Sequence, residues 1–199
     1  MFKLTRFIQS TLVFIGVTFL AGCGSSAQEG PNYYQLPFNT TTSSAQSDQI
    51  GRSLPVVWIE PIILSSQLAS RNIAFQTSDV NYTLAQNHLW ASALEEQLSV
   101  AFETDLNAIL SGFFITRQGN SQADYRVQIS VLEFHPRFDG KVVMSGRFNI
   151  TSKSGKTITQ AFKSETLLTK DGYEESVRQL AVLWQKEIEL IAQKIREIN

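Results

Sequence analysis

The sequence predicts an α+β fold, a two-layer α/β sandwich in which two long helices cover one face of a mostly antiparallel sheet. Two stretches, residues 88–111 and 171–198, have apolar residues at helical spacing. Between them, three stretches alternate apolar and polar residues, as strands with one buried face do. This order of helix, strands and helix fits one sheet with both helices packed on the same face.

Residues 1–22 are predicted to be a signal peptide that precedes the fold. Lys3 and Arg6 form a basic start, residues 7–20 are uncharged and largely apolar, and small residues follow. An uncleaved signal anchor is the alternative. It is disfavoured because a membrane-spanning helix needs about 20 apolar residues, and this run is shorter.

The signal peptide ends in Leu20-Ala21-Gly22-Cys23, which resembles the lipobox of bacterial lipoproteins. The thiol of Cys23 would carry a diacylglycerol thioether, and the small Gly22 would let a peptidase cleave between Gly22 and Cys23. The chain has one cysteine, which excludes an intramolecular disulfide. We therefore predict a covalent lipid on Cys23 and no other cofactor. Two or three acyl chains hold a protein at a membrane far more firmly than one.

The residue after the cysteine indicates the membrane. In enterobacterial lipoproteins an aspartate at this position favours retention in the inner membrane, and here the residue is Gly24. The absence of aspartate resembles outer-membrane sorting. The predicted location is therefore the outer membrane, with a lipid-anchored domain on its periplasmic face.

A polar tether is predicted over residues 23–53, beginning with the lipidated cysteine. Ser, Thr, Gln, Asn and Gly dominate it, with little periodicity. Tyr33, Tyr34 and Leu36 interrupt the polar run. They fit either a short edge strand docked on the domain, which we favour, or a contact with a partner. A single folded domain is then expected over residues 54–199.

The domain is predicted to begin with strands. Residues 54–64 form an apolar run rich in β-branched residues, which suits a buried strand, and Pro61 is expected to end or bulge it. Residues 72–76 and 81–85 are predicted as short strands on either side of a turn at Ser78-Asp79. These strands would precede the first long helix.

Residues 88–111 are predicted to form that helix. An apolar residue recurs at every fourth position, and three more widen the stripe. Asn87 is a candidate N-cap, and Gly112 is a candidate C-terminal stop. The apolar positions are Trp90, Ala93, Leu94, Leu98, Ala101, Phe102, Leu106, Ile109 and Leu110.

Four strands are predicted after this helix. Residues 113–116 form a short one. Residues 124–131 and 141–151 alternate apolar and polar side chains, and Asp139-Gly140 between them is typical of a hairpin turn. Residues 156–168 follow as the last strand. One face of this sheet should be apolar and the other polar.

The chain ends in the second predicted helix. Asp171 and Glu174 have the spacing of a capping box. The apolar residues that follow step by four and three positions and form one seam, which we expect to pack on the sheet rather than on a partner helix. The seam consists of Val177, Ala181, Trp184, Ile188, Ile191, Ile195 and Ile198.

No catalytic or metal-binding motif is evident in the sequence. His88 and His135 are the two histidines, and neither has a cysteine or carboxylate at a familiar metal-ligand spacing. A nucleophile elbow and a Gly-rich phosphate loop are both missing. The net charge of −1 disfavours a nucleic-acid partner. We therefore expect a protein that is not an enzyme, with no catalytic residue and no metal.

Several features, in this order, resemble one family. The lipobox is followed by YYQLP at 33–37, VVWIEPIIL at 56–64 and HLWASALEEQL at 88–98, and then by three strands and a C-terminal helix. Together they are similar to the auxiliary lipoproteins of ABC-type transport systems, of the PqiC/YmbA type. The resemblance spans nearly the whole chain. One departure is the segment 61–72, which tends to be shorter in family members.

The resemblance implies an accessory, non-enzymatic role in transport between the inner and outer membranes. It implies a periplasm-spanning MCE-type partner that carries lipid or other hydrophobic molecules, a contribution to membrane integrity, and a homo-oligomeric ring as a possible assembly. Two other hypotheses remain open. One is a lipoprotein regulator of a peptidoglycan-synthesising enzyme. The other is a hydrolase whose unrecognised site would involve His88 and His135.

Overall fold

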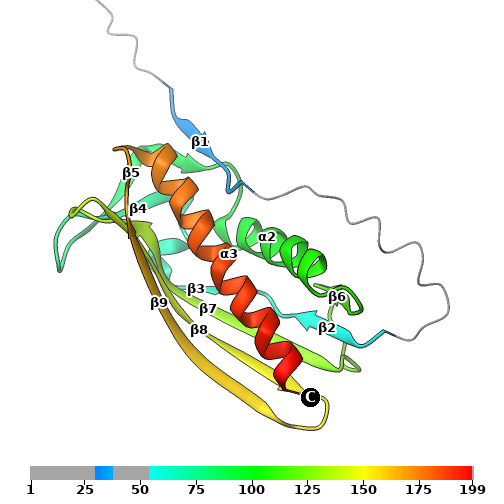
Figure 1. Ribbon diagram of the computed structural model, residues 1–199. Helices are drawn as coiled ribbons and strands as arrows, with labels where there is room; N and C mark the ends of the chain where they lie inside the picture. Colours follow the sequence, from blue (N-terminus) through cyan, green and yellow to red (C-terminus); the bar gives the residue numbers. More distant parts are fainter. Residues whose placement is uncertain (1–29, 38–53, 199) are drawn as a thin grey trace, which may run out of the picture. The chain divides into compact units, whose positions relative to one another are not determined.

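A computed structural model describes residues 30–37 and 54–198 (Figure 1). Gly22 and Cys23 lie outside the described residues, so lipidation and signal cleavage remain predictions. The compact unit begins at Pro31. Residues 31–37, which the sequence analysis counted with the tether, therefore belong to the folded unit.

The main sheet has six strands in a mixed arrangement. The strand order is β6-β2-β7-β8-β9, and β3 pairs with β7 beyond the end of β2. The long strands β7, β8 and β9 are antiparallel to one another, whereas β2, β3 and β6 pair in parallel. The strands are β2 (Val56–Ile59), β3 (Ile63–Leu64), β6 (Phe114–Thr116), β7 (Tyr125–Pro136), β8 (Lys141–Ser152) and β9 (Thr157–Leu167).

The predicted strands of this sheet are confirmed. Pro61 lies in the break between β2 and β3, because a residue without a backbone N–H cannot continue the ladder. Gly140 adopts a positive φ of 74° in the turn between β7 and β8, which is the conformation that favours glycine. The hairpin predicted at Asp139-Gly140 therefore forms where expected.

A second, three-stranded sheet has the order β1-β5-β4, and the sequence analysis did not separate it from the main sheet. Its strands are β1 (Asn32–Tyr34), β4 (Asn72–Gln76) and β5 (Tyr82–Trp90). The hairpin of β4 and β5 turns at the predicted place, and β1 adds to β5 in parallel. A single parallel bridge between Gln76 and Arg137 joins this sheet to the end of β7.

Two helices, α2 (Leu94–Ile109) and α3 (Tyr173–Glu197), lie on one face of the main sheet, as predicted (Figure 1). A 3-10 turn, η3 (Ser66–Leu68), precedes β4. Helix α3 packs on β7, β8 and β9, and α2 packs on α3 and β6. Buried side chains of the helices and both sheets form one core.

The predicted start of α2 is wrong by six residues. Residues 88–90 complete β5, where the Trp90 backbone N–H donates to the carbonyl of Arg71 at 2.7 Å. Asn87 and His88 are therefore strand residues, and Ala93 occupies the N-cap position without a side-chain cap. Trp90 fits the helical spacing because it lies four residues before Leu94, but it is buried as the last residue of β5. The spacing alone therefore extended the predicted helix too far toward the N-terminus.

The capping box predicted for α3 is also absent. Gly172 is the N-cap residue, with no side-chain cap. The Ser176 hydroxyl donates to the Gly172 carbonyl at 2.9 Å, and the carboxylate of Glu175, rather than Glu174, accepts from the Thr169 hydroxyl at 2.7 Å. The acidic residues at this end remain favourable for the helix dipole.

The apolar seam of α3 packs on the sheet as predicted. Ile188, Ile191 and Ile195 are fully buried, and Ala181 is the seam residue left half-exposed. The Trp184 ring lies 6.0 Å from that of Phe102 on α2. The seam therefore joins both helices to the sheet and is not left for a partner helix.

The opposite face of the sheet is polar over its middle, whereas toward the β7–β8 turn it carries the buried His135 and Val143 and is covered by the second sheet. Gln128 on β7 donates to the Glu60 carboxylate at 3.1 Å and accepts from the Asn149 side chain at 3.3 Å. The Thr159 hydroxyl on β9 donates to the Asn149 side-chain oxygen at 2.9 Å. Arg126 forms an ion pair with Glu60 at 3.3 Å. A continuous chain of polar contacts therefore runs from Glu60, just after β2, across β7, β8 and β9 on the face away from the helices.

Candidate functional site

The N-terminal arm, residues 32–37, is the feature around which the candidate site is built. Its strand β1 lies in parallel register on β5, with Tyr34 opposite Trp90. The Ala91 backbone N–H donates to the Tyr34 carbonyl at 2.7 Å. The arm therefore reaches the domain through the same backbone pairing that holds a sheet together.

Beyond the strand, Leu36 anchors the arm in the core. Its side chain is 2% exposed, and its backbone N–H donates to the side-chain oxygen of Gln97 at 2.8 Å. The Gln97 amide nitrogen donates to the carbonyls of Ser92 at 3.1 Å and Tyr34 at 3.4 Å. Since buried polar groups must be paired, Gln97 holds both the arm and the first turn of α2 in place.

An aromatic cluster closes the other side of the arm. The Tyr34 hydroxyl and His88 Nδ1 are 2.8 Å apart, within hydrogen-bonding distance. The His88 ring stacks on that of Tyr173 at the start of α3, with centroids 3.9 Å apart. Burial, followed by the nearby Glu174 charge, raises the pKa of the Tyr34 hydroxyl. Arm, second sheet and α3 therefore meet in this cluster.

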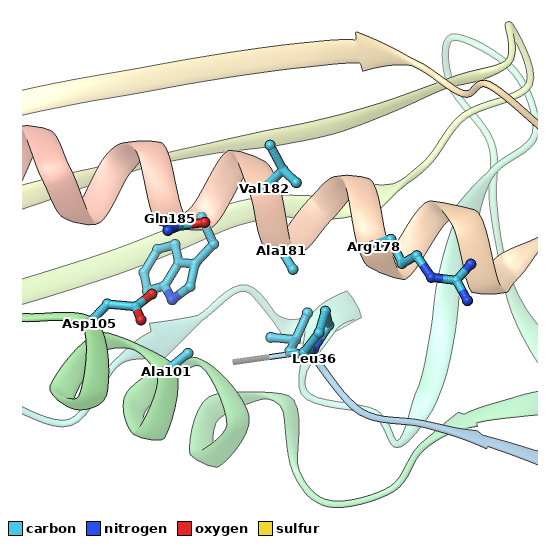
Figure 2. Close-up of a pocket in the computed structure, with 9 residues that line it drawn as sticks. Leu36, Ala101, Asp105, Arg178, Ala181, Val182 and Gln185 are labelled. Carbon is cyan, nitrogen blue, oxygen red and sulfur yellow. The ribbon is translucent and has the colours of Figure 1, made fainter. Parts of the chain in front are cut away.

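A pocket of about 270 Å³ lies where the arm enters between the helices (Figure 2). Leu36 lies at its floor, Asp105 faces it from α2, and Gln185 faces it from α3. Burial, followed by the charge of Glu189, raises the pKa of Asp105. Its remaining lining residues are Pro37, Ala101, Arg178, Ala181, Val182 and Trp184.

The structure places the three arm residues of the sequence analysis differently from one another. The edge-strand hypothesis is confirmed, because β1 pairs with β5. Tyr33 is 59% exposed, Tyr34 is half-buried against His88, and Leu36 lies in the core. Within this fold, Tyr33 is the one of the three whose side chain is open to a partner.

The two histidines lie in separate places. His88 belongs to the aromatic cluster, whereas His135 is fully buried near the end of β7. His135 Nδ1 is 3.1 Å from the Pro136 carbonyl, and its ring meets that of Tyr82 edge-on at 5.1 Å. Burial lowers the pKa of His135. The structure therefore does not bring the two residues of the hydrolase hypothesis together.

Within residues 30–37 and 54–198, no group of three or more His, Cys, Asp or Glu side chains is arranged to hold a metal ion. None of the helices in the same part of the chain is long and apolar enough to span a membrane.

Sequence reasoning missed Gln97 and Tyr173 as parts of the site. Gln97 is a polar residue that is buried on α2. Its position beside Leu98 of the apolar stripe was the sequence feature that could have indicated a buried, hydrogen-bonded side chain. Tyr173 carries no such signal, because its partner His88 is far away in the chain.

The fold defines a small α+β domain, and its N-terminal arm is anchored in the core by Leu36. A family model described as ABC-type transport auxiliary lipoprotein component matches residues 34–192, and the chain belongs to this family. The resemblance drawn from the sequence is thereby confirmed.

Individual relatives agree with this assignment. The chain is 37% identical over 187 residues to the intermembrane transport lipoprotein PqiC of Escherichia coli K12, covering 94% of this chain and 97% of that protein. An uncharacterized protein of known crystal structure is 34% identical, with a TM-score of 0.73 over 84% of this chain and 99% of that one. A Xanthomonas campestris protein, 11% identical, has a TM-score of 0.63 over 84% and 100%, and shares the fold.

Proposed function

We propose that this chain is a lipid-anchored accessory subunit of an intermembrane transport system and that it performs no catalysis itself. The observation that carries the proposal is the 37% identity to the intermembrane transport lipoprotein PqiC over 94% of the chain. The lipobox that ends at Cys23 supports the anchor, and Gly24 supports the outer membrane as its location. The domain would then face the periplasm and support the integrity of the envelope.

The proposed partner is an MCE-type protein that spans the periplasm and carries lipid or another hydrophobic cargo. The partner and the homo-oligomeric ring come from the family resemblance. The arm supports a docking role, because its backbone pairing and the burial of Leu36 fix the point where the tether meets the domain. Tyr33 is exposed at that point.

Photocrosslinking in intact cells tests the partner. A photoreactive phenylalanine analogue at Tyr33 is expected to capture an MCE-type protein. The matched control carries the analogue at Lys153, which is exposed in the β8–β9 turn. Capture of only a peptidoglycan synthase from Tyr33 would contradict the transport proposal and favour the regulator hypothesis.

Replacing Cys23 by Ala tests the anchor. The C23A protein should keep its folded domain, since the compact unit begins at Pro31. It should lose the mass of the lipid and no longer fractionate with the outer membrane. A C23A protein that still fractionates with the outer membrane at its processed mass would contradict the proposed lipid anchor.

A further inference from the structure

We propose that one end of the domain rests directly on the bilayer surface to which the protein is anchored. This surface, the apolar end, consists of Val80, Tyr82, Leu84, Phe138 and Leu167. The proposal rests on the lipid anchor proposed above and adds a second, non-covalent contact with lipid. Its occupant is the headgroup region of the bilayer.

The apolar end is unusually rich in exposed apolar side chains. Val80 is 78% exposed at the tip of the β4–β5 hairpin, Leu167 is 64% exposed and Phe138 is 53% exposed. Large exposed apolar patches on a folded domain mark protein or membrane contact sites. Six of the ten large apolar residues exposed in the described part of the chain are these five and Tyr33 on the adjacent arm.

Backbone contacts bring the members of the apolar end together. Gln76 pairs with Tyr82 across the β4–β5 hairpin, and the Gln76 carbonyl accepts from the Phe138 backbone N–H at 2.9 Å. Leu167 at the end of β9 lies opposite Lys141. Lys141 is the first residue after the β7–β8 turn, and that turn carries Phe138. The two hairpin turns and the end of β9 therefore lie at the same end of the domain.

The other end of the domain is mostly polar, and Phe114 on β6, 45% exposed, is the large apolar residue exposed there among the described residues. The β8–β9 turn carries Lys153, Ser154 and Lys156, all exposed, and the loop after β6 includes Gln118 and Gly119. Figure 1 shows this end at the close of α3, with the β4–β5 and β7–β8 turns at the opposite end, near the start of α3. The two ends therefore differ in what they could contact.

The arm directs the apolar end toward the anchor. Because β1 is parallel to β5, with Asn32 opposite His88, β1 begins at its end nearer to Tyr82 and the hairpin tip. Nine residue steps separate Cys23 from Asn32, which span at most about 30 Å. Helix α3, with its 25 residues, is about 37 Å long. The tether is therefore too short to bring the polar end to the membrane.

The charges around the apolar end favour apolar contact over attraction to anionic lipid. Arg137 is paired with Asp139 at 2.6 Å and with Glu165 at 3.3 Å, and Lys141 is paired with Glu165 at 2.5 Å. These basic groups are neutralised within the domain. Contact with the bilayer should therefore persist in high salt and in vesicles that lack anionic lipid.

Site-specific fluorescence in proteoliposomes tests the proposal. Once Cys23 carries its lipid, a V80C substitution supplies the reactive thiol of the mature protein for an environment-sensitive label. The matched control is K153C, at the polar end. Both labelled lipoproteins are reconstituted in phosphatidylethanolamine–phosphatidylglycerol vesicles, with and without a headgroup spin label, and checked by flotation.

The expected result is that the V80C label shifts to shorter wavelength and is quenched by the spin label, while the K153C label does neither. If both proteins float with vesicles and neither label is quenched, the anchor holds and the contact is refuted. If the V80C label is shielded from aqueous iodide but not quenched by lipid, another protein surface covers the apolar end and the proposal is wrong. Failure to float would refute the anchor and, with it, this contact.

Discussion

The two faces of the main sheet are built from the same strands but differ in what their side chains contact. On β8, Phe148 and Ile150 point toward α3 and are fully buried, whereas Asn149 between them belongs to the polar chain on the other face. Burying a large apolar side chain contributes about 1.5–3 kcal/mol, and a net hydrogen bond about 0.5–1.5 kcal/mol. The helix-covered face therefore supplies stability, while the polar face keeps the sheet hydrated and its strands in register.

The largest effect is expected on the covered face. Trp184→Ala should lower the free energy of unfolding by about 3–5 kcal/mol, because it leaves a cavity between α2 and α3 and removes the indole donor of the Leu98 carbonyl at 3.3 Å. Lys186→Ala, two residues away and exposed, should change it by less than about 0.5 kcal/mol. Urea unfolding measures both free energies, and equal losses would contradict the larger contribution of the helix-covered face.

Leu36 of the arm is buried in the same core as the helix-covered face of the sheet. Leu36→Ala should weaken the free energy of arm docking by about 2–5 kcal/mol. Because few backbone bonds hold the arm, this loss should open the arm more than it unfolds the domain. Hydrogen exchange at the Ala91 amide, which donates to Tyr34, should become faster. Tyr33→Ala, at an exposed position, serves as the control and should leave that exchange unchanged.

Glu187 on α3 is an exception on the helix-covered side, because it is a buried carboxylate among apolar residues. It is 5% exposed, one carboxylate oxygen lacks a partner among the described residues, and burial raises its pKa to about 6. A raised pKa favours the protonated form in the folded state. Ionisation therefore costs stability as pH rises from about 4.5 to about 6, in total about 2 kcal/mol.

Glu187→Gln should remove that cost. The variant is expected to match the parent near pH 4 and to exceed it by about 2 kcal/mol at pH 7. Thermal unfolding of both proteins across this range gives the difference curve, in which other titrating groups such as His135 cancel. A flat difference would show that the carboxylate is not desolvated.

The smallest effect is expected on the polar face. Asn149→Ala removes the bonds to Gln128 and Thr159 and should cost about 0.5–1.5 kcal/mol, because both partners can turn to water. Arg147→Ala is the control, an exposed residue on the same face of β8. A loss as large as that of Trp184→Ala would mean that the polar chain is a second source of stability.

The sequence predicted best where local pattern and burial agree. The strands β7, β8 and β9 alternate over much of their length and turn at Gly140 and Gly155, so neighbours in sequence are neighbours in the sheet. The buried run at 142–146 and the bulge between Val131 and Glu133 were not predicted. The apolar seam of α3 was predicted correctly, because its spacing of four and three positions matches the residues that the helix buries. The start of α2 failed because Trp90 satisfies both a strand and a helical spacing, and tertiary pairing with the segment before β4 decides between them.

Non-local pairing limited the prediction of the site. Tyr34 and Leu36 stood out as apolar residues in a polar stretch, and that was enough to favour an edge strand. Their partners were not predictable, because Gln97 lies 61 residues after Leu36 and His88 lies 54 residues after Tyr34. The parallel addition of β1 and the separate second sheet both depend on such distant partners.

The docking of β1 also sets an order of folding. The arm is the first part of the compact unit to be synthesised, but its partners β5 and α2 come more than 50 residues later. Contacts so distant in sequence must overcome a large loop-closure entropy and form after local hairpins. By this argument the arm docks after the local β4–β5, β7–β8 and β8–β9 hairpins have formed. An arm that stays open would mark a chain that has not finished folding.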